Sequence, residues 1–380
     1  MIINTLIGTN TDISDSTVTE NDVMNGETIC NNEGQITGIV PFEYIETESN
    51  IDNYKVLEDE MNIMLPNGEK KTLQVVSVGN DTWVKASTID TTTYDSCQHI
   101  CYGNGIYIIN TFGKYILYSN NLSSWSAVKV PDTDTSETGH YNLCYGDNKF
   151  VLVTTGGSNF SAYSVNGSTW TPTTLPASQQ WVGICYGNNK FVAISHTSGG
   201  FASDIAAYST DGINWTQITL PSSAKWQGIC YGDGKFIVTA YNSDIAAYST
   251  DGINWTQTIM SESLKWDEVC YGNNCFIATA WNVAKVAIST DCINWSLHDL
   301  PASAGWCDIA YGNRRFIIIS RNGSSNPVVY SDDNGITWTQ ISSSNMSSSN
   351  NEICYAKDRF VIMSTSTVVY NINYRKFTLA

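Results

Sequence analysis

The residues best suited to chemistry in this 380-residue chain are carboxylates and indoles placed at equivalent points of a repeated pattern. Asp267, Glu268 and Asp308 lie at the start of equivalent apolar segments in adjacent repeats. Two carboxylates that face one bond can serve as general acid and base in glycoside cleavage. The alternative is that these acids lie on solvated loops and do no chemistry.

Tryptophan occupies one position in four consecutive repeats, four residues before a Cys or Ala. Neighbouring connections add further aromatic, amide and guanidinium groups. Indole faces beside amides suit sugar rings, because the indole contacts the apolar C–H surface while amides bind hydroxyls. We therefore predict a ligand-binding face made of Trp181, Trp226, Trp266, Trp306, Tyr241, Asn242, Trp281, Asn282 and Arg321. The alternative is that the four repeated tryptophans are ordinary packing between repeats.

An internal repeat of about 40 residues positions both the carboxylates and the predicted ligand-binding residues. Its marker is a Tyr–Gly or Tyr–Ala pair at Tyr102, Tyr145, Tyr186, Tyr231, Tyr271, Tyr311 and Tyr355. Within one copy, short apolar runs cover 181–187, 191–195, 205–209 and 215–221, separated by Gly, Asn, Asp and Pro. Such runs are typical of β-strands joined by tight turns, and no helical periodicity interrupts them.

Four short strands in each repeat are typical of a β-propeller blade. Closing the ring buries each sheet between two neighbours and leaves few exposed edges. We therefore predict an all-β, seven-bladed β-propeller over 71–380. Residues 74–87 resemble the last two strands of a repeat, so we expect them to pack at the seam between the first and last blades. How they share that blade with 374–379 stays open.

The turn between the third and fourth strands has its own pattern, Ser-x-Asp-Gly-x-x-Trp, as in 209–215. It resembles the Asp-box of sialidase-like propellers. An Asp in such a turn accepts backbone N–H groups, Gly supplies a positive φ, and Trp anchors the hairpin. We therefore assign a structural role to Asp211, Asp251, Asp291, Asp333, Trp215, Trp255, Trp295 and Trp338. Each turn offers too few oxygens for Ca²⁺.

The resemblance implies sialidase activity only where three arginines can grip a carboxylate. All five arginines of this chain follow residue 313, so an arginine triad drawn from separate blades cannot be assembled. We therefore expect a non-enzymatic protein. A glycan-cleaving, sialidase-like enzyme is the alternative function, and a purely structural capsid or tail subunit is another.

Six of the eleven cysteines directly precede the marker tyrosine of a repeat, and the cysteines show no disulfide or metal spacing, so we expect mostly reduced, buried thiols, no metal and no cofactor. A pI near 4.5 argues against nucleic acid as a partner. No apolar run approaches the length of a bilayer span, and the N-terminus lacks the pattern of a signal peptide, so we expect no membrane insertion.

Residues 1–70 hold 14 acidic and two basic residues, which marks them off as an acidic N-terminal segment. Segment 12–40 resembles a short module of bacteriophage tail and fibre proteins. This implies a virion protein, assembled in the host cytoplasm, that docks on other virion proteins through 1–70. The propeller would then face outward to bind a host cell-surface glycan or to decorate the particle. A homo-oligomer follows by analogy with other particle proteins. An acidic linker that only tethers the propeller is the alternative.

Overall fold

The computed structural model describes residues 39–41, 60–64, 70–78, 82–131, 141–321, 328–341, 350–372 and 374–379, with side chains only between 83 and 371. These residues form two compact units, 1–84 with 371–380, and 85–370. The charge profile predicts a boundary near 70, at the start of strand β3 (Lys70–Val78), whereas the compact units divide at 84. No helix in the described ranges is long and apolar enough to cross a membrane.

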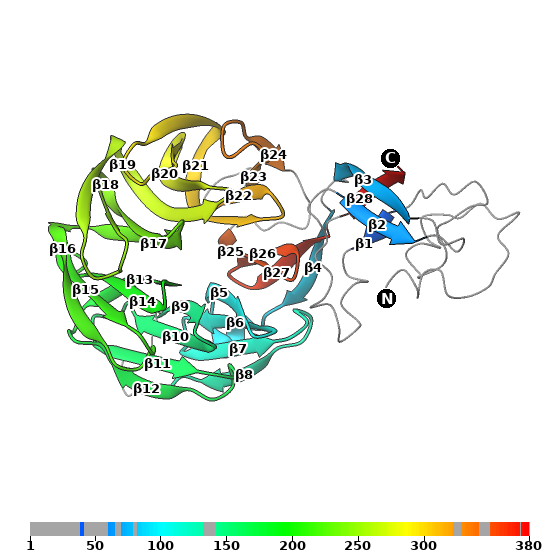
Figure 1. The fold of residues 1–380 in the computed structure, drawn as a ribbon. Helices are drawn as coiled ribbons and strands as arrows, with labels where there is room; N and C mark the ends of the chain where they lie inside the picture. Colours follow the sequence, from blue (N-terminus) through cyan, green and yellow to red (C-terminus); the bar gives the residue numbers. More distant parts are fainter. Residues whose placement is uncertain are drawn as a thin grey trace, which may run out of the picture. The chain divides into compact units, whose positions relative to one another are not determined.

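The larger unit is a ring of four-stranded antiparallel blades (Figure 1). We name the strands of each blade A to D from the axis outward. Blade 1 contains β5 (Cys97–Gly103), β6 (Ile106–Thr111), β7 (Tyr115–Ser119) and β8 (Ser126–Lys129). Blade 2 contains β9 (Tyr141–Gly146), β10 (Lys149–Thr154), β11 (Phe160–Ser164) and β12 (Thr171–Thr174). Blade 3 contains β13 (Gln180–Gly187), β14 (Lys190–His196), β15 (Ser203–Ser209) and β16 (Thr216–Ala224).

Blades 4 to 6 share one eight-stranded sheet, because long strands serve two roles each. Strand β19 is strand D of blade 4 and strand A of blade 5, and β21 joins blades 5 and 6 in the same way. The strands are β17 (Trp226–Gly232), β18 (Lys235–Ser249), β19 (Thr256–Gly272), β20 (Cys275–Ser289), β21 (Ser296–Gly312), β22 (Arg315–Ser320), β23 (Val328–Ser331) and β24 (Thr339–Ile341).

Blade 7 closes the ring with a strand from the other end of the propeller sequence. Its first three strands are β25 (Asn350–Ala356), β26 (Arg359–Ser364) and β27 (Thr367–Ile372), and its fourth is β4 (Thr82–Thr88). After β4, the amide of Ile89 donates to the carbonyl of Ser366 at 2.7 Å, and the helix α3 (Thr91–Tyr94) leads into blade 1. The strands nearest the axis contact each other in the order β5, β9, β13, β17, β19, β21, β25 and back to β5. The predicted propeller class is confirmed.

The seam differs in detail from the predicted single segment 74–87. Residues up to Val78 belong to β3 and only 82–88 join blade 7. Strand β28 (Tyr374–Leu379) pairs with β3 in a separate sheet ordered β1-β28-β3-β2, which includes β1 (Ile39–Pro41) and β2 (Glu60–Met64). The N-terminal strand therefore replaces 374–379 in the last blade.

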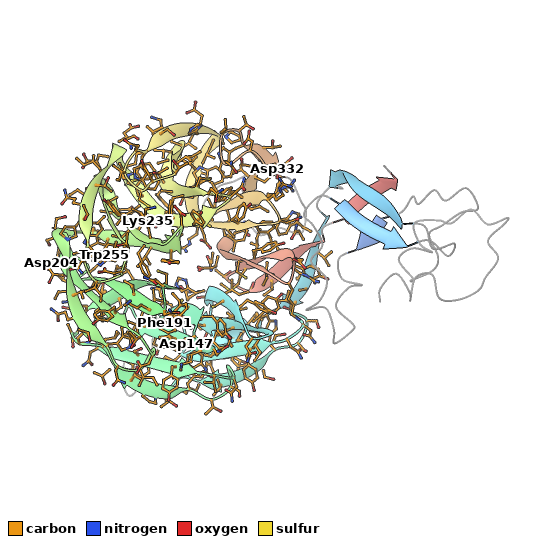
Figure 2. All side chains as sticks on the ribbon, viewed as in Figure 1. Asp147, Phe191, Asp204, Lys235, Trp255 and Asp332 are labelled. Atoms are coloured by element: carbon orange, nitrogen blue, oxygen red, sulfur yellow. The ribbon has the colours of Figure 1, made fainter. Side chains whose placement is uncertain are left out.

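The core of the ring lies between blades, where side chains from two neighbouring sheets meet (Figure 2). Phe191 is fully buried in this layer, and the same position holds Phe236, Phe276, Phe316 and Phe360 in later blades. The Tyr–Gly pair locks neighbours together, because the tyrosine ring of one blade lies directly on the glycine of the preceding blade. A Cβ at Gly187, for example, would overlap the ring of Tyr231.

Candidate functional site

The two faces of the ring carry different connections. Strand A begins at the face that also carries the B–C connections, which we call the BC face. The A–B and C–D turns lie at the opposite CD face. Each A strand has a bulge near its start in blades 1 and 3 to 7, which changes the register before the tyrosine. This irregularity re-aims side chains at the BC end of the axis.

A cluster of carboxyl groups occupies this end of the axis in blades 5 to 7. The third residue before the tyrosine is Glu268 in blade 5, Asp308 in blade 6 and Glu352 in blade 7. In blade 1 the same position is His99, whose Nδ1 lies 2.9 Å from Oε2 of Glu352. The repeat therefore places three acids and a histidine on consecutive innermost strands. We call these four residues together with Asp267 the axial cluster.

Hydrogen bonds between blades fix the axial cluster. The carboxylate of Asp308 accepts the amide of Ile309 and the amide of Ile353 in the next blade, both at 2.7 Å. The side chain of Asn351 donates to the carbonyl of Cys97 at 2.9 Å. Because the bonds from Ile353 to Asp308 and from Asn351 to Cys97 join strands of different blades, the cluster depends on a closed ring.

Burial changes the acidity of these carboxyl groups. Desolvation raises the pKa of Asp267 to about 6, although the guanidinium of Arg321 opposes that shift. Desolvation also raises the pKa of Glu268 and that of Asp308 well above their ordinary values, and the neighbouring carboxylate of Glu352 adds to both shifts. A carboxyl group with a raised pKa can hold a proton near neutral pH, which is what a general acid requires.

Two of the predicted aromatic residues lie partly exposed on the BC face. Tyr241 in blade 4 and Trp281 in blade 5 are each the tenth residue after the blade's marker tyrosine. Both belong to paired strands and not to loose loops, since Tyr241 pairs with Lys265 and Trp281 pairs with Gly305. These ladders hold the two aromatic residues in a fixed orientation before any ligand binds.

Polar groups surround the two rings. The ammonium group of Lys225 lies 5.6 Å from the centroid of the Tyr241 ring. Asn242 and Asn282 follow the aromatic residues, are exposed, and adopt the positive φ values of 57° and 60° that Asn tolerates. Arg321 holds the aromatic position in blade 6, is exposed, and donates to the carbonyl of Asn351 at 3.4 Å. These predicted residues therefore gather on one face.

The four repeated tryptophans lie elsewhere. Each is fully buried between two blades; the four are Trp181, Trp226, Trp266 and Trp306. Trp226, for instance, packs against Val192 and Leu220 of the preceding blade. An indole with no exposed face cannot stack on a sugar, so we reassign these four to the core. They are ordinary packing residues between the blades.

The Ser-x-Asp turns form hydrogen-bonded caps on the CD face. Asp211 accepts the backbone amides of Ile213 and Asn214, both at 2.8 Å, and Gly212 adopts a φ of 71°. The same pattern is built around Asp251 and Asp291. Backbone N–H groups of Asn294 and Ile293 hold the pKa of Asp291 well below its ordinary range. The carboxylates of these aspartates accept hydrogen bonds from the backbone amides of their own turns.

In the fourth such turn, Asp333 accepts the amide of Thr337 at 2.9 Å, and Trp338 donates to the carbonyl of Gly335 at 2.8 Å. Trp295 and Trp338 are nearly buried, whereas Trp215 and Trp255 are partly exposed. Within the described ranges, no group of three or more His, Cys, Asp or Glu residues is arranged to hold a metal ion.

Sequence reasoning missed His99, Glu352, Lys225 and Lys265. His99 and Glu352 could have been found by aligning every repeat on its tyrosine, since they share the position of Glu268 and Asp308. The two lysines immediately precede buried tryptophans, and only the strand pairing brings them beside Tyr241.

Comparison with known proteins supports the fold. Neither a family model nor a curated protein matches this chain. Among solved structures, virginiamycin B lyase from Staphylococcus aureus is similar with a TM-score of 0.66 and 13% identity, over 79% of this chain and 100% of that one. YCF48 from Cyanidioschyzon merolae is similar with a TM-score of 0.57 and 12% identity, over 76% and 98%. The WD40 β-propeller domain of Doa1 is similar with a TM-score of 0.57 and 10% identity, over 76% and 96%.

The first of these neighbours corrects one prediction. Virginiamycin B lyase is an enzyme with a similar ring, so the missing arginine triad does not make this chain a non-enzymatic protein. The prediction rested on one type of propeller chemistry and cannot be extended to others. At 13% identity the likeness shows the fold alone and assigns no reaction.

Proposed function

We propose that the propeller recognises a carbohydrate on its BC face. The observation that carries this proposal is the pair Tyr241 and Trp281, partly exposed at the same position of two adjacent blades and flanked by Asn242 and Asn282. Aromatic rings offer apolar faces to sugar C–H groups, and the neighbouring amides can bind hydroxyls.

Rigidity supports the same conclusion. Because the B–C hairpins of blades 4 and 5 pair with the following D–A segments, the backbone that carries both rings is held by hydrogen bonds. Lys285 of blade 5 also forms an ion pair at 2.7 Å with Glu262, which lies in the D–A segment that follows blade 4. A surface ordered in advance loses less conformational entropy when it binds.

The test is binding of the purified full-length protein to a panel of bacterial cell-surface polysaccharides, measured by titration calorimetry. The double variant Tyr241→Ala, Trp281→Ala should weaken binding at least about tenfold. Ile336→Ala is the matched control, because Ile336 is 60% exposed on the CD face and should not affect affinity. Equal affinity of the double variant and the wild type would refute the proposal, as would the absence of binding to every polysaccharide.

A second function, glycan cleavage, is favoured by the axial cluster. Asp267, with its pKa raised to about 6, can donate a proton to the oxygen of a leaving sugar, and the other carboxyl groups of the axial cluster can orient a water molecule. Asp267→Asn should then abolish release of reducing ends from a bound polysaccharide while leaving its affinity within about threefold. A wild-type protein that binds polysaccharide without releasing reducing ends would exclude this function.

We also propose that this recognition module is displayed on a bacteriophage particle. The support is the resemblance of 12–40 to tail modules, together with the acidic charge of 1–70. All but a few of those residues lie outside the described ranges. Antibody labelling of purified particles by electron microscopy tests the location, and labelling confined to host cells without particles would refute it.

A further inference from the structure

One position of the BC face holds an aromatic, imidazole or guanidinium side chain in blades 3 to 6, as it holds Phe112 in blade 1. The tenth residue after the marker tyrosine is His196 in blade 3, Tyr241 in blade 4, Trp281 in blade 5 and Arg321 in blade 6. His196 is buried and bonds to the carbonyl of Trp226 at 2.7 Å, so it does not face a ligand. The aromatic group of blade 3 comes instead from the longer B–C connection that follows it.

That connection presents Phe201, which is 74% exposed. Its backbone is fixed, because the amide of Phe201 donates to Oγ1 of Thr197 at 3.1 Å and the amide of Thr197 donates to the carbonyl of Phe201 at 3.0 Å. The ring lies against Gly199, where a Cβ would come within 2.9 Å of it. An aromatic ring held outward by a closed turn suits contact with a partner.

We infer that the BC face binds an extended glycan chain that runs from blade 3 to blade 5, with Phe201, Tyr241 and Trp281 as successive stacking positions. This inference rests on the proposed carbohydrate function. Packed sheets lie about 10 Å apart, so residues on adjacent blades are separated by more than one sugar ring. A single sugar can therefore use one position, whereas an oligosaccharide can use all three.

Charge agrees with a chain that continues past the aromatic positions. Lys225 and Lys265 lie beside Tyr241, and Arg321 follows Trp281 in the next blade. These cations lie along the same arc as the rings and can bind hydroxyl or carboxylate groups of successive sugars.

The experiment measures how affinity depends on chain length. Malto-oligosaccharides, chito-oligosaccharides and oligogalacturonates, from single sugars to octasaccharides, are titrated into the full-length protein by calorimetry. In the series that binds, affinity should rise at least about tenfold from disaccharide to octasaccharide. Phe201→Ala should lower octasaccharide affinity about tenfold, or ~1.4 kcal/mol, and so reduce the rise in affinity from disaccharide to octasaccharide.

Ile336→Ala again serves as the control, since it removes an apolar side chain of similar exposure from the CD face. Thermal unfolding of each variant checks that the ring is intact. Equal affinity for all lengths, or an octasaccharide affinity that Phe201→Ala does not change, would overturn the inference while leaving carbohydrate binding intact. No binding to any oligosaccharide or polysaccharide would refute the proposed function itself.

Discussion

At the scale of single residues, burial decides which side chains can do chemistry. Tyr241 and the four repeated tryptophans are alike in the sequence, since all are aromatic residues near strand ends. The tryptophans are buried between blades, because the next sheet covers their position, while Tyr241 lies in the part of β18 that pairs with Lys265 at the BC face and is partly exposed. The sequence shows the periodicity of such residues but does not show which side of a bulge faces the neighbouring blade.

The same effect makes Asp267 a stability determinant that depends on pH. Its folded pKa of about 6 lies above the unfolded value of about 3.9, so the folded state binds the proton more tightly. The contribution of the Asp267 carboxyl group to the free energy of unfolding is therefore fully present below pH 4 and is lost as the pH rises through 6. Asp267→Asn should stabilise the protein by about 1–2 kcal/mol at pH 8 and by nearly nothing at pH 4, as measured by urea unfolding.

A suitable control is Asp204→Asn, which changes another acid of the BC face, near the edge of the ring in Figure 2. With Asp204→Asn, the free energy of unfolding should differ between pH 8 and pH 4 by as much as it does in the wild type. If Asp267→Asn has the same effect at both pH values, the carboxyl group is not the buried acid that the structure describes.

At the scale of elements, the C–D turns were predicted in chemical detail. The bonds between Asp251 and the amides of Ile253 and Asn254 are those that the residue order indicates. Blade 2 performs the same task with Asn166, which accepts the amides of Ser168 and Thr169 at 3.0 and 2.9 Å. Local hydrogen bonding of this kind needs only a few consecutive residues, so sequence suffices to predict it.

Asp251→Ala should therefore destabilise the protein by about 1–3 kcal/mol, because two amides lose their acceptor. Asp251→Asn should cost less than about 1 kcal/mol, since an amide oxygen already serves in blade 2. Urea unfolding followed by tryptophan fluorescence measures both. A loss for the Asn variant as large as that for the Ala variant would mean that the negative charge, and not the acceptor geometry, is what the turn needs.

The long strands of blades 4 to 6 were not predicted, and their cause is tertiary. Ser203 follows Tyr186 by 17 residues, whereas Ser243 follows Tyr231 by only 12. The shorter connection in blade 4 leaves no loop, so β18 continues through it and pairs with β19. The identical segments 203–217 and 243–257 therefore contribute to strands of different length, which no local pattern reveals.

The Tyr–Gly pair is visible in the sequence as a repeated marker, but only the structure shows that it forms a contact between neighbouring blades. A Cβ on Gly232 would overlap the ring of Tyr271, so Gly232→Ala should cost about 3 kcal/mol or more and shift thermal unfolding accordingly. Blade 7 has Ala356 at this position, so Ala356→Gly is the matched control and should cost under about 1 kcal/mol. Similar losses for both variants would contradict the locking role of the glycine.

At the scale of the whole molecule, closure depends on a strand far from its partners in sequence. Strand β4 supplies the outer strand of blade 7, and it brings the buried side chains of Trp83 and Ile89 to the seam. The repeat predicted that an N-terminal strand would clasp the ring, but the competition between 82–88 and 374–379 could not be resolved. Both segments have the composition of an outer strand, and in the structure β28 pairs with β3 of a second sheet instead.

Two truncations separate the contribution of this strand from that of the preceding residues. Residues 82–372 keep β4, whereas 90–372 lack it and leave the edge of β27 unpaired. Loss of the burial of Trp83 and Ile89 alone should cost about 4 kcal/mol, and the open edge should promote association. The shorter chain should therefore unfold at a markedly lower temperature and elute as aggregates in size-exclusion chromatography, while 82–372 remains a folded monomer or defined oligomer. Equal unfolding temperatures for the two chains would show that the ring closes without β4. The hydrogen bonds between blades in the axial cluster would then have to be held in place by contacts other than those of β4.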